Sequence, residues 1–332
     1  MVPFMNIRRA DQEKKPDNGG SRPVTVAMLT YRRPLDLAEA IPAILSHTTS
    51  CRPPAELLVI DNDPAGSAAE AVRQFSDRGV RYVHEPRPGI AAARNRALRE
   101  SSADALLVFI DDDERPHEQW LEQLLAAYAR FGSAAVVGPV ISEFDQEPED
   151  WITAGRFFDR RRLPTGTKID VAATNNLLLD LRQVNALALT FDESFGQSGG
   201  SDTLFTRQLA RAGAELVWCD QAVVSDRVPV GRLSRKWVLS RAFRSGNSWI
   251  RTSLKMSPTS RERIAIRLRA ISLGLVRIAG GSTRVVVGVG ARSLGQRVRG
   301  IRTVFRGAGM VAGAAGYTYQ EYRRPPPTDL RP

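Results

Sequence analysis

Three consecutive carboxylates, Asp111, Asp112 and Asp113, directly follow the apolar run 105–110 (ALLVFI). The run is continuous and partly β-branched or aromatic, which predicts a short buried strand. Adjacent aspartates repel one another and lose hydration on burial, so a cation should neutralise them. Mg²⁺ and Mn²⁺ prefer carboxylate oxygens and often keep substrate phosphates as further ligands. The pattern indicates a divalent metal site, with a solvated turn that caps the next helix as the alternative.

A further carboxylate that could take part in a reaction ends the sequence Gly199-Gly200-Ser201-Asp202, which opens the helical pattern 203–212. Ser201 or Asp202 could simply cap this helix, a frequent use of both residue types. Alternatively, Asp202 stands on a glycine-supported turn, where its carboxylate could remove a proton from a substrate.

The elements that must position these residues alternate between strand and helix over 24–140. This spacing predicts a Rossmann-like, doubly wound and mostly parallel α/β sheet whose ligands lie at the carboxyl ends of the strands. The expected strands are 24–29, 56–60, 80–83, 105–110 and 134–137, and the expected helices are 35–46, 68–75, 90–101 and 117–131, the last with Pro116 near its first turn.

Polar residues follow several of these strands. Thr30, Tyr31 and Arg33 follow the first strand, Asp61 ends the second, and Arg94 lies in the helix before the fourth. Each could belong to an ordinary turn or helix. Together they would line one sheet edge with hydroxyl, carboxylate and guanidinium groups, as a charged nucleotide requires. No GxxxxGK[ST] loop occurs, and no GxGxxG follows the first strand, so neither a P-loop NTPase nor an NAD-binding fold is supported.

The alternation breaks at 142–170, a segment typical of a functional lid or of disorder, although Trp151, Phe157 and Phe158 argue against plain disorder. A second, smaller sheet is expected from 171–180, followed by a helix over 181–188. Residues 1–21 are polar and predict a disordered leader without a secretory signal. The two cysteines and three histidines are scattered, which disfavours a zinc site or a disulfide framework and fits a reducing compartment.

Charge is distributed unevenly along the 332 residues. The chain has a net charge of +11, whereas 227–332 holds 22 basic and 3 acidic residues, or +19, which leaves −8 for 1–226. The two parts should therefore meet different partners.

Six motifs in order resemble the inverting family 2 glycosyltransferases of GT-A fold over about residues 22–250. They are TYRRP, IDND, GIAAARN, FIDDDExP, TNNLLL and FDESFGxxGGSD. The tail, from RLSRKW to GYTYQEY, is similar to bacterial enzymes that build exopolysaccharides of the succinoglycan type. The resemblance implies a nucleotide-binding half at 22–140, an acceptor half at 141–250 and a basic, helical extension at 251–332.

The same resemblance implies roles for individual residues. Thr30, Tyr31, Arg33, Asp61, Arg94, Asp111 and Asp112 would bind the nucleotide of a nucleotide-sugar donor, with Asp61 accepting a hydrogen bond from the base. Asp111 and Asp113 would hold Mn²⁺ or Mg²⁺. Related enzymes often carry a His where this chain has Asp226, so Asp226 is either a third metal ligand or a solvated loop carboxylate.

Asp202 would be the catalytic base, and Gly200 and Trp237 would lie on the acceptor side. The implied activity is metal-dependent, inverting transfer of a sugar from a UDP-sugar to a hydroxyl of a glycan or lipid-linked acceptor in cell-surface polysaccharide synthesis. Two alternatives stay open: a non-catalytic nucleotide-sugar or glycan-binding module, and a nucleotidyltransferase.

The basic tail predicts a membrane contact. Arg277, Arg284, Arg292, Arg299 and Arg306 recur every seven or eight residues and would share one arc of a helix, opposite Leu, Ile and Val. This pattern is typical of an interfacial helix on anionic lipid, at the inner, cytoplasmic face of the plasma membrane. The alternative is a basic helical subdomain packed on the catalytic domain. Gly280, Gly281, Gly288 and Gly290 weaken the prediction of a helix. Nucleic acid is a third interpretation of the charge, but the tail has few aromatic residues and no recognised binding motif, so we expect no nucleic acid as a partner.

Overall fold

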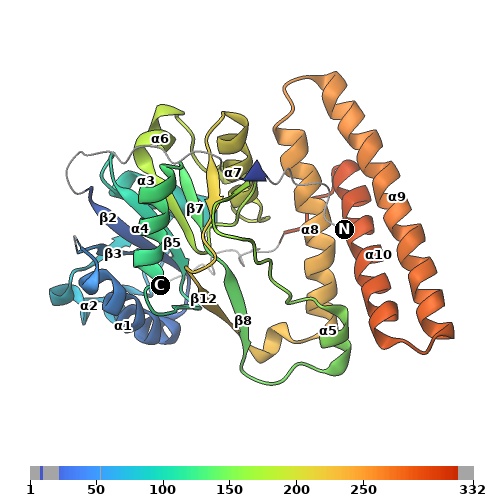
Figure 1. Cartoon of the computed structure of the whole chain (residues 1–332), viewed down its shortest axis with the longest axis horizontal. Helices are drawn as coiled ribbons and strands as arrows, with labels where there is room; N and C mark the ends of the chain where they lie inside the picture. The colour runs from blue at the N-terminus through green and yellow to red at the C-terminus, as the bar shows by residue number, and fades with distance from the viewer. Residues whose placement is uncertain (1–7, 10–21, 53, 321–332) are drawn as a thin grey trace, which may run out of the picture. The chain divides into compact units, whose positions relative to one another are not determined.

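The computed structural model describes residues 8–9, 22–52 and 54–320, which form two compact units (Figure 1). Unit 1 comprises the chain up to Asp145, Asp159–Phe191 and Asp202–Val228. Unit 2 comprises Gln146–Phe158, Asp192–Ser201 and the chain from Pro229 onwards. The domain boundary expected between residues 250 and 251 falls inside a helix of unit 2, α8 (Arg235–Lys255).

Unit 1 is built on one large sheet with the strand order β1-β9-β11-β7-β10-β5-β2-β3-β4. Its strands are β1 (Arg8–Arg9), β2 (Val24–Thr30), β3 (Glu56–Asp61), β4 (Val80–His84), β5 (Leu106–Asp111), β7 (Ala135–Val137), β9 (Thr167–Ile169), β10 (Leu177–Asp180) and β11 (Leu216–Trp218). β2 pairs in parallel with both β3 and β5, and β3 pairs in parallel with β4. The predicted α/β fold with a mostly parallel sheet is therefore confirmed.

One local prediction about the large sheet is wrong. The segment 171–180 does not open a second sheet, because β10 inserts antiparallel between β5 and β7, with Leu177 opposite Phe109. Its fully buried Leu177–Leu179 run fits the middle of a sheet covered on both faces. Within the expected disordered leader, Arg8–Arg9 form β1 and pair with β9; the rest of 1–21 lies outside the described residues.

Helices cover both faces of this sheet. They are α1 (Pro34–Ser50), α2 (Ala69–Arg73), η1 (Ser76–Arg78), α3 (Ile90–Glu100), α4 (Trp120–Phe131), α6 (Leu181–Ala186) and α7 (Ser201–Arg211). Successive residues of β2 divide between two cores, because strand side chains alternate. Val26 and Met28 pack with α1 and α4, whereas Ala27 packs with α3, α6 and α7.

The small second sheet consists of β6 (Glu114–Pro116), β12 (Val224–Val228) and β8 (Val140–Phe144), in that order. β6 pairs antiparallel with β12, with Glu114 opposite Asp226. This pairing corrects the start of the fourth predicted helix: Pro116 ends a strand, and α4 begins only at Trp120.

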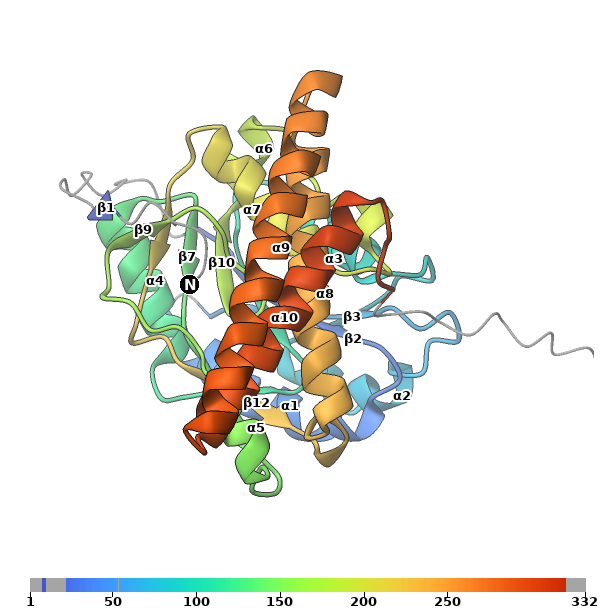
Figure 2. The ribbon, with the colours of Figure 1, turned by 90° about the vertical axis from the view of Figure 1, so that its right-hand side faces the viewer.

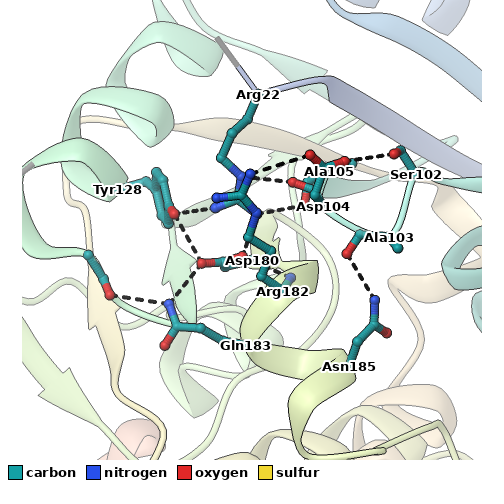
Figure 3. Close-up of polar contacts among 11 residues, drawn as sticks. Arg22, Ser102, Ala103, Asp104, Ala105, Tyr128, Asp180, Arg182, Gln183 and Asn185 are labelled. Carbon is teal, nitrogen blue, oxygen red and sulfur yellow. Dashed lines mark hydrogen bonds and ion pairs between the residues drawn. The ribbon is translucent and has the colours of Figure 1, made fainter. Parts of the chain in front are cut away.

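A buried ion pair lies at the edge of the sheet where the parallel strands β2 and β5 begin and the antiparallel strand β10 ends (Figure 3). Arg22 precedes β2 and its Nη2 lies 2.5 Å from Asp180 Oδ1, with side-chain exposures of 9% and 5%. Tyr128 of α4 donates to Asp180 Oδ2 over 3.0 Å and accepts a hydrogen bond from Arg22. Asp180 also caps α6 by accepting from the Arg182 N–H. Three parts of the chain that are distant in sequence, namely the segment before β2, α4 and the junction of β10 with α6, thus meet at one carboxylate.

Unit 2 is helical. It contains α5 (Asp150–Gly155), η2 (Glu193–Phe195), η3 (Val230–Arg232), α8 (Arg235–Lys255), α9 (Ser260–Gly290) and α10 (Leu294–Ala314). Figure 2 shows α10 lying against both α8 and α9. The prediction of one helical arc of arginines is wrong, because the helix ends at Gly290 and α10 starts a second helix; Arg299 and Arg306 belong to α10.

Among the described residues, α9 is the one helix long and apolar enough to cross a membrane by length and composition, with a mean hydropathy of 1.4 over 18 residues. Only 17% of that window is buried in the structure. Core helices of soluble proteins can meet the same criterion, so α9 is not assigned as a span on this ground.

Candidate active site

The three aspartates lie where β5 ends, at the carboxyl edge of the large sheet. Thr30 at the end of β2 donates from Oγ1 to Asp112 Oδ2 over 2.8 Å. Arg33 bridges two carboxylates, with Nη1 2.6 Å from Asp112 Oδ1 and 3.0 Å from Asp113 Oδ2. Thr30 and Arg33 were expected to bind the nucleotide, which stays a prediction; in the structure both contact the aspartate cluster.

The cluster carries more negative charge than its surroundings neutralise. Burial and the charges of Asp113 and Asp112 together raise the pKa of Asp111 to about 7, although the charge of Arg94 acts to lower it. Burial also raises the pKa of Asp112 to about 6 despite Arg33. Burial acts to lower the pKa of Arg33, but the two aspartates outweigh it and raise that pKa. The charged cluster is therefore poised for a cation.

Glu114 is a further member of the cluster that sequence analysis did not single out. It is 1% exposed, accepts from the Asp111 N–H over 2.9 Å and accepts from Asn175 Nδ2 over 2.9 Å. Burial and the charge of Asp111 raise its pKa well above the usual value. Its place directly after the three aspartates, and Asn175 within the TNN sequence, were the available signals.

Asp226 is not a solvated loop carboxylate. It lies in β12, is 8% exposed and forms an ion pair with Arg160. The Arg227 N–H donates to the Asp113 carbonyl over 3.0 Å, and the charge of Asp226 raises the pKa of Asp111. Asp226 therefore belongs to the electrostatic environment of the cluster, and its role as a metal ligand stays a prediction.

The residues of this edge fit a hard divalent cation. Asp111 and Asp113 offer carboxylate oxygens, and burial together with the charges of Asp113 and Asp112 raises the pKa of Asp111. Over the described ranges, no group of three or more His, Cys, Asp and Glu side chains is arranged to hold a metal by itself. Mg²⁺ sites commonly combine one or two protein carboxylates with substrate phosphates and water. The donor set suits that arrangement.

The loop after β3 is held by two buried side chains. Asp61 is fully buried, and its oxygens accept from the N–H groups of Asp63 and Ala68 and from the Tyr82 hydroxyl. The carboxylate thus fixes its own loop, and contact with a nucleotide base stays a prediction. Asn62 donates to two carbonyls and accepts from the Gly89 N–H over 3.1 Å. It therefore ties this loop to the start of α3, a role that the sequence did not indicate.

Arg94 of α3 reaches the same edge. It is 7% exposed, its guanidinium carbon lies 5.6 Å from the ring centre of Phe191, and its charge acts on Asp111. The next residue, Asn95, exchanges hydrogen bonds with the backbone of Phe191 at 2.8 and 2.9 Å. Tyr31 is half-buried, and Arg32 lies over its ring at 5.2 Å.

Asp202 lies in the first turn of α7 and is partly exposed. Its Oδ1 accepts from the Thr203 N–H over 2.7 Å. Thr206 fixes the helix through hydrogen bonds of 3.1 Å to both backbone groups of Ala172. This hydrogen bond is compatible with a catalytic role for Asp202, since a carboxylate has further lone pairs.

The segment that precedes Asp202 packs on α8 within unit 2. Gly200 has a φ of +95°, and a Cβ there would lie 2.2 Å from Ser248 Oγ. Arg251 lies over the Phe195 ring at 4.6 Å, and Lys255 pairs with Asp192 at 2.8 Å. A row of α8 side chains thus holds the glycine turn.

Trp237, expected on the acceptor side, belongs to an aromatic cluster of unit 2. Its ring stacks on Phe158 with 6.0 Å between centres and an angle of 4°. Arg241 lies over the Trp237 ring at 5.4 Å. Trp237 and Phe158 are only half-buried, so this stack retains exposed ring surface.

The α/β fold, with its mostly parallel sheet and small second sheet, is of GT-A type. A mannosyltransferase from Pyrobaculum calidifontis, solved with GDP-Man and Mn²⁺, superposes with a TM-score of 0.60 at 17% identity, over 90% of this chain and 88% of that chain. At this identity the likeness establishes the fold.

The model of glycosyl transferase family 2 matches residues 25–182. The succinoglycan biosynthesis protein ExoM of Rhizobium meliloti (strain 1021) is 34% identical over 228 residues, 68% of this chain and 73% of that protein. The glycosyltransferase AglE of Haloferax volcanii is 28% identical over 77% of this chain and 80% of that protein. The chain belongs to glycosyl transferase family 2 and is a glycosyltransferase.

Proposed function

We propose that this glycosyltransferase is metal-dependent and inverting, and that it moves a sugar from a UDP-sugar to a hydroxyl of a glycan or lipid-linked acceptor. The observation that carries the proposal is the acidic edge, where Arg33 pairs with Asp112 and Asp113 and the buried Asp111 lies beside them. A divalent cation would supply the positive charge that this edge lacks, and it would also bind the phosphates of a nucleoside diphosphate. Similarity to a succinoglycan biosynthesis protein supports a role in cell-surface polysaccharide synthesis.

The reaction is a single displacement. Asp202 accepts the proton of the acceptor hydroxyl, whose oxygen attacks the anomeric carbon of the donor sugar. A new carbon–oxygen bond forms while the bond from the anomeric carbon to the diphosphate breaks, and the electron pair leaves with the nucleoside diphosphate. Attack from the face opposite the leaving group inverts the anomeric centre, so no second carboxylate is needed as a nucleophile.

The remaining residues bind and orient the donor. Mn²⁺ or Mg²⁺, held by Asp111 and Asp113 with Asp226 as a candidate third ligand, would neutralise negative charge on the diphosphate. Arg94 adds a buried guanidinium at the same edge. Thr30 and Arg33 hold Asp112 in place for contact with the ribose.

The acceptor side is proposed for Gly200 and the Trp237 cluster. Aromatic rings offer flat apolar surfaces, and the neighbouring Arg241 could meet an acidic group of a glycan or a phosphate of a lipid-linked acceptor. We also propose that the enzyme acts at the inner, cytoplasmic face of the plasma membrane. The excess of arginine in α9 and α10 supports attraction to anionic lipid.

Calorimetric binding of UDP, GDP, dTDP and CMP, each with Mn²⁺ and with EDTA, tests the donor site without an acceptor. Metal-dependent binding of UDP that Asp113→Ala abolishes is the expected result. Asp77→Ala, at an exposed carboxylate in η1, is the matched control and should bind as wild type does. Binding of GDP alone would correct the nucleotide, and no binding of any nucleotide would refute the proposal.

Asp202→Asn separates catalysis from binding. We expect the variant to keep metal-dependent UDP affinity and to lose sugar transfer by at least about 100-fold, as general-base catalysis typically contributes. Wild-type enzyme without transferase activity on any acceptor, but with tight UDP-sugar binding, would favour the non-catalytic module instead.

A further inference from the structure

Helices α9 and α10 of unit 2 contact each other backbone to backbone through glycines. A Cβ at Gly281 would lie 2.8 Å from the Gly300 carbonyl oxygen, and one at Gly300 would lie 2.7 Å from that of Gly281. Gly274 and Gly307 form a second such pair, at 2.9 and 2.6 Å. Larger residues at these positions would push the helices apart. The glycine side of α9 is thus fully occupied by α10.

The other side of α9 is apolar and exposed. Every exposed residue between 270 and 290 is uncharged. We call the large exposed side chains of this helix the α9 outer face: Ile264 (57%), Leu268 (61%), Leu273 (38%), Leu275 (54%), Val276 (67%), Val286 (70%), Val287 (56%) and Val289 (58%). A helix rises about 1.5 Å per residue, so this stretch, in which Arg277 and Arg284 are half-buried, extends over roughly 30 Å. Apolar patches of this kind mark interaction sites.

The positive charge around the α9 outer face indicates which kind of partner covers it. Residues 263–320 contain ten arginines and no acidic residue. Exposed arginines lie near both ends of the face. Arg261, Arg263, Arg267 and Arg269 lie around its first residues, and Arg292 and Arg297 follow its last residue. A second copy of the chain would bring the same positive charges against these arginines, which is unfavourable. An anionic bilayer attracts both ends and accepts the apolar middle.

The partner helix determines how α9 can lie in the lipid. α10 carries Arg297, Arg299, Arg302 and Arg306, and the glycine contacts keep it against α9. Insertion of the pair across a bilayer would bring these guanidinium groups into hydrocarbon, which is strongly unfavourable. With α9 parallel to the membrane plane, only its apolar side enters the lipid and α10 stays on the aqueous side.

We propose that the α9 outer face is the membrane-binding surface of this protein and lies in the plane of an anionic bilayer, with its apolar side chains below the headgroups. The α9 outer face would mediate the membrane association that forms part of the proposed function, and this proposal rests on that function. It replaces the expected stripe of arginines by an apolar face with basic ends.

Co-sedimentation of the full-length protein with vesicles tests the surface. We expect binding to phosphatidylcholine vesicles containing about one third phosphatidylglycerol, much weaker binding to phosphatidylcholine alone, and loss of binding at high salt. Val286→Glu/Val289→Glu should reduce binding to the anionic vesicles at least about tenfold, because two charges would enter the apolar boundary. Val230→Glu is the matched control, at a 50% exposed valine of η3 outside the face, and should bind as wild type does.

A fluorescent label reports insertion directly. Both native cysteines, Cys51 and Cys219, are buried, so a polarity-sensitive thiol dye can be placed at Val286→Cys or, as a control, at Val230→Cys. Anionic vesicles should shift the emission of the first to the blue and leave the second unchanged. Equal binding of the wild type and Val286→Glu/Val289→Glu would overturn the proposal.

Self-association is a distinct outcome. A wild-type dimer that the double Glu variant disperses, without vesicle binding, would assign the face to a second copy and overturn the proposal. Calorimetric UDP binding with Mn²⁺ is measured on the same samples. Retained nucleotide binding without vesicle binding would refute the membrane surface and leave the donor site standing, so the two proposals fail separately.

Discussion

The two ends of the large sheet in unit 1 use carboxylates in opposite ways. At the amino ends, Asp180 accepts hydrogen bonds from Arg22, Tyr128 and neighbouring groups (Figure 3). Burial acts to raise its pKa, but these partners outweigh burial and lower it. At the carboxyl ends, burial and neighbouring aspartates raise the pKa of Asp111 to about 7. The negative charge of Asp180 is thus compensated by its hydrogen-bond donors, whereas the negative charge around Asp111 is not fully compensated.

The difference separates stability from function in physical terms. A buried carboxylate with its full set of donors favours the folded state at neutral pH. A buried cluster of like charges opposes folding until a cation binds, and the free energy released on binding then includes relief of that repulsion. The same residue type therefore stabilises the sheet at one end and prepares a binding site at the other.

Asp111→Asn should produce the largest functional effect and no loss of stability. Removal of this charge eliminates a candidate metal ligand, so we expect UDP affinity with Mn²⁺ to fall at least about 100-fold. In EDTA the variant should melt at the wild-type temperature or above it, because repulsion with Asp112 and Asp113 disappears. Calorimetry and thermal melts check both statements.

The control for Asp111→Asn is Asp77→Asn, an exposed carboxylate in η1, which should change neither property. A lower melting temperature of Asp111→Asn in EDTA would contradict the comparison, since Asp111 would then be a stabilising residue like Asp180.

Asp180→Asn should have the converse effect. Breaking a buried ion pair leaves Arg22 without its counter-charge, so we expect a loss of about 3 kcal/mol of unfolding free energy at neutral pH. UDP affinity with Mn²⁺ should be unchanged in the folded protein. Asp104→Asn, which removes the charge from an exposed pair with Arg182, is the control and should change stability little.

The free energy of unfolding that Asp180 contributes should decrease as the pH falls. The pKa of Asp180 is lower in the folded protein than its usual value of 3.8, so the unfolded state binds the proton more tightly. The stability that Asp180 contributes is fully present well above pH 3.8 and is lost as pH falls through the lower folded pKa. Denaturation of wild type and Asp180→Asn should therefore differ by a constant amount from about pH 6 to 8 and converge in acid. A difference that grows in acid would contradict the assignment.

The sequence predicted the sheet and its acidic edge because both depend on local pattern. Apolar runs bounded by polar turns mark strands, and the carboxyl ends of parallel strands necessarily share one edge. The direction of β10 was not predictable, since its apolar run fits a buried strand of either direction. Glu114 and Asn62 were missed because their roles rest on contacts with residues far from them along the chain.

The C-terminal helices show how one residue type can mislead. By helix propensity alone, Gly280, Gly281, Gly288 and Gly290 argue against a helix, because glycine costs about 1 kcal/mol relative to alanine. In the structure Gly281 and Gly300 allow two backbones to meet, and tertiary contact outweighs the local cost. The recurrence of glycine at 274, 281 and 288 was the available signal.

Thr30→Val offers the smallest and most discriminating test, because β2 runs from one end of the sheet to the other. The substitution keeps the shape of Thr30 and removes the hydrogen bond of 2.8 Å to Asp112. A hydrogen bond of this kind contributes about 1 kcal/mol, so we expect UDP affinity with Mn²⁺ to fall roughly threefold to tenfold as Asp112 loses a donor.

Thr25→Val is the matched substitution near the amino end of the same strand, where Thr25 is equally buried. It should leave UDP affinity unchanged, whatever it does to the melting temperature. Equal losses of affinity in both variants would mean that β2 transmits a general packing defect to the site. A loss confined to Thr30→Val would show that the carboxyl end of the strand supports nucleotide binding through the orientation of Asp112.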